Sequence, residues 1–142
     1  MPSNFSMRMM NATHRLLIKV SGGHYGWFLA GMPMLYLTTT GRKSGTKRST
    51  MLSSPMKVHG SYIVVASRGG DERHPAWYLN LRDHPEVDVV IQGGAVEPRI
   101  ARIATADERD RLWPQITAKF PNYAEYQEKT SREIPLVFLE PV

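Results

Sequence analysis

The fold of this chain is decided by the segment T-T-T-G-R-K-S-G-T-K-R-S-T, residues 38–50, which follows the apolar run Met34-Leu35-Tyr36-Leu37. The segment carries two glycines, four cations and several hydroxyls, and it contains no acidic residue. Glycine lets backbone N–H groups turn toward an anion, and the arginine guanidinium matches phosphate or carboxylate. We therefore expect a loop between two strands that holds an acidic ligand. The alternative is a solvated, basic hairpin tip. The residue order differs from G-x-x-x-x-G-K-[ST], so this is not a Walker loop.

Length and composition indicate one globular domain with a sizeable core, since the chain has 142 residues and 42% hydrophobic content. The sequence contains no cysteine, which excludes disulfides and thiolate metal sites and fits a reducing cytoplasm. No apolar run approaches the roughly 18 residues of a membrane span. Arg15 and Lys19 interrupt the apolar residues near the N-terminus, which argues against a signal peptide. We expect a cytoplasmic protein.

The net charge of +5 is unevenly distributed along the chain. Residues 1–70 contain nine Lys and Arg and no Asp or Glu, so they carry +9, whereas residues 71–142 contain nine cations and 13 acids and carry −4. This asymmetry indicates that the first half handles an anionic partner, such as a nucleic acid, a lipid surface or a polyanionic cofactor.

The chain divides into a segment of residues 1–32 and a domain of residues 33–142. Residues 7–20 are predicted to form a basic amphipathic helix that ends at Gly22-Gly23. Residues 24–32 are predicted to form a loop or short helix. The helix has three possible roles: packing on the core, covering a pocket, or resting on the inner face of a membrane.

About six strands are predicted, at residues 34–40, 48–58 with a bend near Pro55, 62–66, 87–91, 95–104 and 134–139. A short helix is expected at residues 76–82. Thr105 and Glu108 form a capping box that opens a longer helix through Phe120, and a further helical turn carries Tyr123 and Tyr126. This pattern favours a mostly β (α+β) fold, a small antiparallel barrel flanked by helices.

The sequence shows no familiar motif for catalysis without a cofactor. The histidines at 14, 24, 59, 74 and 84 lack metal-site spacing, so no metal ligands are assigned, and His74 is interpreted as a helix-start residue. There is no G-x-S-x-G motif and no evident carboxylate pair. If the protein is an enzyme, a cofactor carries the chemistry.

Taken together, the motifs resemble the deazaflavin-dependent nitroreductase family, the split-barrel quinone and nitro reductases that use reduced coenzyme F420. The matching pieces are L-T-T-T-G-R-K-S-G from Leu37, V-V-A-S-R-G-G from Val64, H-P-A-W-Y-L-N-L from His74, H-P-E-V at 84–87, A-D-E-R at 106–109, F-P-N-Y-A-E-Y-Q at 120–127 and I-P-L-V at 134–137. The resemblance covers residues 33–142 and implies a split β-barrel of the FMN-binding type.

The resemblance also implies the site. It places the cofactor's phosphate and polyglutamate tail on Arg42, Lys43, Ser44 and Arg48, and the deazaflavin ring along Ser49, Thr50, Met51, Leu52 and Ser53. It assigns ring-edge or phosphate contacts to Val65, Ala66, Ser67 and Arg68, and a cover to Ala76, Trp77, Tyr78, Leu79 and Asn80. Trp77 and Tyr78 are equally open to a role as core anchors. Tyr123 and Tyr126 fall on the substrate side.

The resemblance therefore predicts a reductase that passes a hydride from reduced F420 to a quinone, a nitroaromatic or an activated enone. A tyrosine near the acceptor would bond its developing charge or relay a proton. Three alternatives stay open at this stage: an FMN-binding enzyme of the same fold, a basic module that binds nucleic acid or lipid, and a cofactor carrier with little turnover. The four-cation loop favours F420 over FMN, and the absence of a nucleic-acid-binding signature argues against nucleic acid as a partner. Split barrels often form homodimers, which the sequence does not test.

Overall fold

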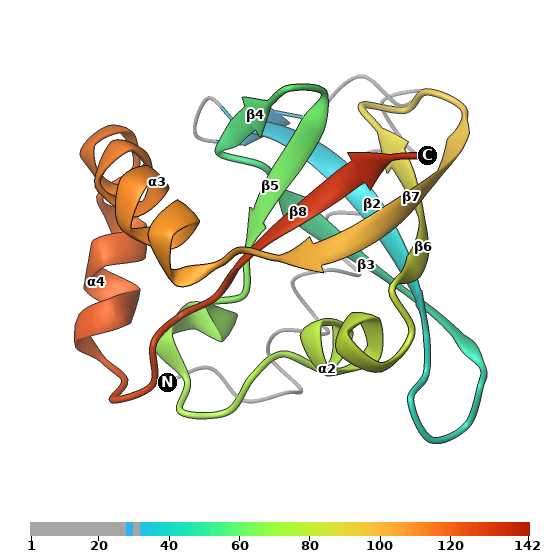
Figure 1. Ribbon diagram of the computed structural model, residues 1–142, viewed down its shortest axis with the longest axis horizontal. Helices are drawn as coiled ribbons and strands as arrows, with labels where there is room; N and C mark the ends of the chain where they lie inside the picture. The colour runs from blue at the N-terminus through green and yellow to red at the C-terminus, as the bar shows by residue number, and fades with distance from the viewer. Residues whose placement is uncertain (1–27, 30–31) are drawn as a thin grey trace.

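A single antiparallel sheet frames the molecule, which the computed structural model describes at residues 28–29 and 32–142. Its strands are β1 (Phe28–Leu29), β2 (Met32–Thr40), β3 (Lys47–Ser53), β4 (Met56–Val58), β5 (Ser61–Val65), β6 (Glu86–Ile91), β7 (Val96–Ile103) and β8 (Leu136–Pro141). They follow the order β1-β2-β6-β7-β8-β5-β4, and β3 pairs with β2. The helices are α2 (Ala76–Asp83), α3 (Ala106–Lys119) and α4 (Asn122–Glu128), with a 3₁₀ turn, η1 (Arg68–Gly70). Figure 1 shows the sheet curled upon itself, which confirms the predicted split barrel.

Two predicted elements differ from the structure. The strand predicted over residues 48–58 is two strands, because Ser54 and Pro55 leave the ladder and the chain turns there. The prediction of a loop or short helix over residues 24–32 is wrong at Phe28–Leu29, which form a short strand. This strand forms because β2 lies alongside as an extended partner for it. The predicted helix over residues 7–20 lies outside the described residues.

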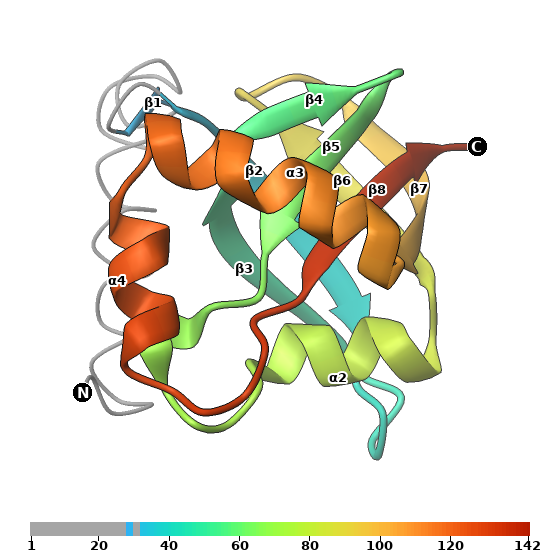
Figure 2. The same cartoon turned by 60° about the vertical axis from the view of Figure 1, so that its left-hand side comes forward.

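The strands β5 and β8 bury both of their faces, so their side chains alternate between two cores. Val64 and Val137 point into the barrel, whereas Ile63 and Leu136 point outward beneath α3 and α4. Figure 2 shows α3 and α4 covering this outer side while α2 lies across one end of the barrel. Continuous apolar runs are the expected sequence for strands covered on both faces.

The barrel is split between β3 and the β4–β5 hairpin. Within the described part of the chain β3 pairs with β2, and no ladder joins it to β4 or β5. Ser54 joins the two sides at a single corner, since its amide donates to the Pro33 carbonyl at 2.9 Å and its hydroxyl donates to the Ile63 carbonyl at 2.8 Å. This break between ladders is what makes the barrel a split one.

The capping box at the start of α3 is confirmed. The Thr105 hydroxyl accepts from the Glu108 amide at 3.2 Å, and the Glu108 carboxylate accepts from the Thr105 amide at 2.8 Å. Glu108 also pairs with Arg102 at 2.7 Å, and hydrogen bonds from Arg102 and the Thr105 amide lower the Glu108 pKa to about 2. Because this pKa is depressed, the stability contributed by Glu108 is present above pH 4.5, its ordinary pKa, and is lost as the pH falls toward about 2.

We expect Thr105→Ala to lower the free energy of unfolding by about 1 kcal/mol, because the first turn of α3 loses its side-chain acceptor. Urea unfolding followed by circular dichroism measures the change. Thr117→Ala is the matched control, because its hydroxyl donates to carbonyls of its own helix, Trp113 at 3.0 Å and Pro114 at 3.4 Å. Equal losses in the two variants would contradict the capping role.

Candidate functional site

The cation-rich segment forms the hairpin loop between β2 and β3. The Gly41 amide donates to the Thr46 carbonyl at 2.8 Å, and the Gly45 amide donates to the Gly41 carbonyl at 2.9 Å. Gly45 adopts a φ of +72°, a left-handed conformation that side chains disfavour. At Gly41 an added Cβ would lie only 2.7 Å from the Ser44 hydroxyl oxygen. Both glycines are therefore required by the tight shape of the loop.

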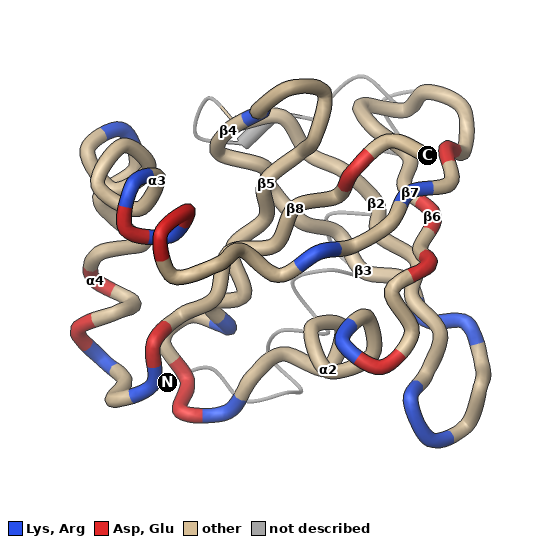
Figure 3. Tube along the Cα trace, viewed as in Figure 1, with Lys and Arg blue, Asp and Glu red and all other residues tan. Residues whose placement is uncertain are grey.

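Four exposed cations cluster on this hairpin without acidic neighbours. Among the described residues no ion pair involves Arg42, Lys43, Lys47 or Arg48. Figure 3 shows this loop bearing blue segments and no red ones. Like charges held close together repel one another, so binding an anion lowers the electrostatic free energy of the loop.

Asn80 fastens this loop to α2. Its side-chain oxygen accepts from the Arg42 amide at 3.1 Å and from the Arg42 guanidinium at 3.3 Å, while its side-chain nitrogen donates to the Thr39 hydroxyl at 3.2 Å. Asn80 is buried. The resemblance implies that it contacts the cofactor, but the structure commits its amide to orienting Arg42.

The residues predicted to line the ring lie on β3, where they alternate between the two faces. Register with β2 places Thr50 and Leu52 on the barrel side, opposite Leu37 and Leu35. Ser49, Met51 and Ser53 therefore occupy the other face. A flat ring cannot meet all five side chains on one face of the strand.

The predicted ring-edge and phosphate residues at the end of β5 are mostly buried. Val65 and Ala66 belong to the outer and inner cores, respectively. Arg68 is buried, adopts a left-handed φ of +48°, and pairs with Asp71 at 3.2 Å. Its charge is therefore already balanced inside the protein, unlike the charges of the hairpin cations.

The residues of α2 that are predicted to cover the cofactor differ in burial. Tyr78 packs in the inner core, as the core-anchor alternative predicted, whereas Trp77 and Leu79 are partly buried and Ala76 is exposed. Pro75 occupies the N-cap position, and no side chain caps the helix there. The first amides of α2 consequently have no capping side chain.

The two tyrosines predicted on the substrate side lie on α4. Their rings meet edge to face, with centroids 6.1 Å apart. Tyr123 is buried, and its hydroxyl lies 3.4 Å from the Ser53 hydroxyl on β3 and 3.4 Å from the Met32 sulfur. Burial raises the pKa of Tyr123 above its ordinary value of 10.0, so the phenol keeps its proton at neutral pH.

The glycine turn after β5 packs directly against α4. An added Cβ at Gly70 would lie 2.8 Å from the Tyr126 carbonyl oxygen and 3.0 Å from the Lys129 Cβ. The turn that follows Ser67 and the helix that carries the tyrosines therefore form one packed unit. The structure thus brings the tyrosines together with Ser53 and with this turn.

Sequence reasoning missed Arg132 and Thr39. Arg132 precedes β8 and bonds to the loop between β5 and α2, while Thr39 holds Asn80. Arg132 lies outside the quoted motifs, and Thr39 lies within L-T-T-T-G-R-K-S-G without any sign of its partner. Their partners lie 66 and 41 positions away along the chain, so only the folded structure reveals these contacts.

The residues of this region suit a multiply charged anion rather than a metal. The hairpin provides four exposed cations, hydroxyls and backbone amides, and no cluster of metal-ligating side chains occurs in the described ranges. The fold and this hairpin are those of a split-barrel protein whose basic loop suits a polyanionic ligand.

The chain belongs to the F420H(2)-dependent quinone reductase family, whose model matches residues 8–141. It is 34% identical over 129 residues to an F420H(2)-dependent quinone reductase of Mycobacterium tuberculosis, covering 89% of this chain and 86% of that protein. The solved structure of an F420-H2 dependent reductase matches with 43% identity and a TM-score of 0.66, covering 76% of this chain and 94% of that one. A structure described as a domain-swapped dimer matches with 39% identity and a TM-score of 0.68, covering 93% of this chain and 96% of that one. The chain is thus an oxidoreductase with coenzyme F420 as its cofactor, and the predicted family is confirmed.

Proposed function

We propose that this protein reduces quinones with F420 held along the seam of the split barrel, its anionic tail on the Arg42–Arg48 hairpin. The observation that carries this proposal is the group of four exposed cations on the β2–β3 hairpin, which make no ion pair within the described part of the chain. A phosphate followed by a string of carboxylates needs several separated cations. A ligand with only one phosphate would pair with one arginine and leave the other cations of the hairpin without an anionic partner.

Each part of the chain has a separate task in this proposal. Arg42, Lys43 and Arg48 bind the tail, and Asn80 keeps the Arg42 guanidinium in place. The first amides of α2 offer hydrogen-bond donors to the polar edges of the ring system. Bound reduced F420 supplies the hydride. The protein holds the cofactor and the acceptor in a fixed orientation, which lowers the entropic part of the activation barrier.

The tyrosines are proposed to serve the acceptor. A quinone gains negative charge on its oxygen as it is reduced, and a phenol that stays protonated can bond to that oxygen or donate its proton. The raised pKa of Tyr123 keeps the phenol protonated, which supports a hydrogen-bond donor to that oxygen and argues against a base. Nitroaromatics and activated enones share this electronic demand, so the proposal includes them as alternative acceptors.

Fluorescence titration with F420 and with FMN tests the cofactor assignment. We expect F420 to bind at least tenfold more tightly than FMN, because each additional charge-assisted contact contributes about 1.5–3 kcal/mol and about 1.4 kcal/mol corresponds to a tenfold change. Raising the salt concentration should weaken F420 binding more than FMN binding. Tighter binding of FMN would move the protein to a flavin-using branch of the fold, and binding of neither would contradict the tail assignment.

Two further expectations concern partners. A homodimer is supported by the similar structure described as a domain-swapped dimer, which is a statement about that protein.

Contact between residues 1–32 and a membrane surface would bring the enzyme to lipid quinones, and its support is the basic amphipathic sequence. No helix in the described part of the chain has the length and apolarity needed to cross a bilayer.

A further inference from the structure

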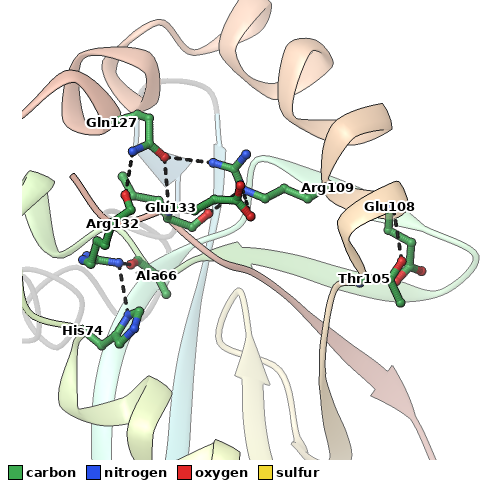
Figure 4. A network of polar contacts seen from close by, with 9 residues as sticks. Ala66, His74, Thr105, Glu108, Arg109, Gln127, Arg132 and Glu133 are labelled. Carbon is green, nitrogen blue, oxygen red and sulfur yellow. Dashed lines mark hydrogen bonds and ion pairs between the residues drawn. The ribbon is translucent and has the colours of Figure 1, made fainter. Parts of the chain in front are cut away.

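Arg132 organises the segment that joins β5 to α2. Its Nε donates to the Asp71 carbonyl at 2.9 Å, and its two terminal nitrogens donate to the carbonyls of Ala66 at 3.1 Å and Ser67 at 2.8 Å. One of these nitrogens also lies 3.2 Å from Nδ1 of His74. Figure 4 shows the guanidinium between Ala66 and His74. A single side chain from the approach to β8 thus holds both ends of this segment.

The segment needs such support because its backbone is unfavourable on its own. Arg68 is a non-glycine residue at a φ of +48°, followed by Gly69 and Gly70 at +64° and +88°. Left-handed backbone at a non-glycine residue typically raises the energy by about 1–3 kcal/mol and persists only where its surroundings hold it. Two of the three carbonyls bonded to Arg132, those of Ala66 and Ser67, come immediately before Arg68, and the third, of Asp71, follows the turn, so Arg132 constrains the chain on both sides of the strained residue.

The contact with His74 sets the state of the imidazole. Every N–H of arginine is a donor, so Nδ1 must accept, and His74 is therefore neutral with its proton on Nε2. Burial, Arg132 and Arg82 all lower the pKa of His74 from its ordinary value of 6.5. On α2 the imidazole also faces the Tyr78 ring, with centroids 4.6 Å apart. The loop has two acidic residues: Asp71 is paired with Arg68 and Arg73, and Glu72 accepts from the Ser131 amide and hydroxyl.

We propose that Arg132 and neutral His74 form a clamp that positions the Ser67–His74 segment and the start of α2 for F420, and that protonation of His74 loosens it. This inference rests on the proposed function, because it assumes that the segment and α2 meet the cofactor. A protonated imidazole has no acceptor for Arg132 and places a second cation 3.2 Å from the guanidinium. Arg132 is a positioning residue in this scheme, acting through the backbone it holds.

Arg132→Lys tests the clamp, with Arg109→Lys as its matched control. Lysine keeps the charge but cannot bond four separated acceptors. Arg109 is a comparable, partly buried arginine, because it donates to the Ile134 carbonyl at 2.7 Å and to Gln127 at 2.9 Å and stacks on Trp113. Its contacts do not include the Ser67–His74 segment. We expect Arg132→Lys to raise the Kd for F420 by about tenfold or more, since misplacing a binding group by about 1 Å has effects of that order. Arg109→Lys should change it less than twofold at temperatures where both variants are folded by circular dichroism.

His74→Asn tests the acid-sensitive part and serves if Arg132→Lys does not fold. The asparagine oxygen can accept from Arg132 but does not titrate. As the pH falls from 7.5 to 5.5, the wild-type Kd should rise more steeply than the Kd of the variant. The ratio of the two Kd values removes titration of F420 itself. Equal pH dependence in the two proteins would overturn the role of His74.

The outcomes separate this inference from the proposed function. If wild-type protein fails to bind F420, the proposed function fails, and the clamp has no cofactor to position. If the wild type binds F420 but Arg132→Lys and Arg109→Lys bind it equally well, the clamp is wrong while the function stands. A selective loss in Arg132→Lys, with a flatter pH profile in His74→Asn, supports both.

Discussion

Replacing Arg42 and Lys43 together with alanine is expected to raise the Kd for F420 by about 100-fold. Both residues are exposed cations on the β2–β3 hairpin and have no acidic partner in the described structure, so their charge is available to a ligand. Hydrogen bonds that involve a charged group contribute about 1.5–3 kcal/mol each, and losing two at the lower end gives roughly two orders of magnitude. Fluorescence titration at low and high salt measures the loss, and the salt dependence of binding should become weaker.

The control removes two other exposed cations, Lys57 on β4 and Arg111 on α3. This double variant has the same change in net charge, but both positions lie away from the hairpin loop. It should lose less than threefold in affinity, because exposed charges beyond about 10 Å are largely screened at ordinary salt. Comparable losses in the two double variants would mean that net charge rather than the hairpin attracts the cofactor, and the tail assignment would fall.

Tyr123→Phe is expected to lower kcat for quinone reduction by about 100-fold, since a positioned proton donor typically contributes 10²–10⁴-fold. The change removes only the hydroxyl and retains the ring that packs in the outer core. We expect the Kd for F420 to change by less than threefold. Single-turnover oxidation of bound reduced F420, followed by stopped-flow absorbance with a soluble quinone, measures the chemical step separately from cofactor binding.

Tyr62→Phe is the matched control, because Tyr62 lies on β5 beneath Lys57 and Arg99, away from α4. Its kcat should stay close to that of the wild type. The competing interpretation is that the buried Tyr123 hydroxyl only packs against Ser53 and Met32. In that case Tyr123→Phe would leave kcat unchanged and lower the free energy of unfolding instead, and the proton-donor role would be wrong.

Local sequence patterns predicted the elements well where a single short-range effect decides the structure. The capping box depends on two side chains three residues apart, and it is present as predicted. The hairpin at Gly41 and Gly45 follows from backbone freedom at fixed positions. The predicted strand over 48–58 was wrong at residues 54–55 because Ser54 is drawn from the ladder by a contact with Ile63, nine residues away.

The candidate site was predicted less completely than the fold. Motif resemblance placed Arg42, Lys43 and Arg48 on an exposed loop, which the structure bears out geometrically, while their role in binding remains a prediction. The same resemblance could not show that Arg68 is neutralised by Asp71 or that Asn80 holds Arg42. A motif identifies a residue's position, whereas the availability of its charge depends on which distant groups pack against it.

The amino-acid sequence by itself determined the anionic character of the ligand, because nine cations and no acid precede residue 71. Its alternating and continuous apolar runs also determined that the chain forms an antiparallel barrel covered by helices. Tertiary structure alone decided which cations of the described residues lie outside ion pairs and which arginine holds the turn before α2. These properties come from contacts between residues far apart in the chain, such as Arg132 with Ala66 and Asn80 with Thr39. Burial and hydrogen bonding at such contacts determine whether a polar side chain serves the fold or remains available to a ligand.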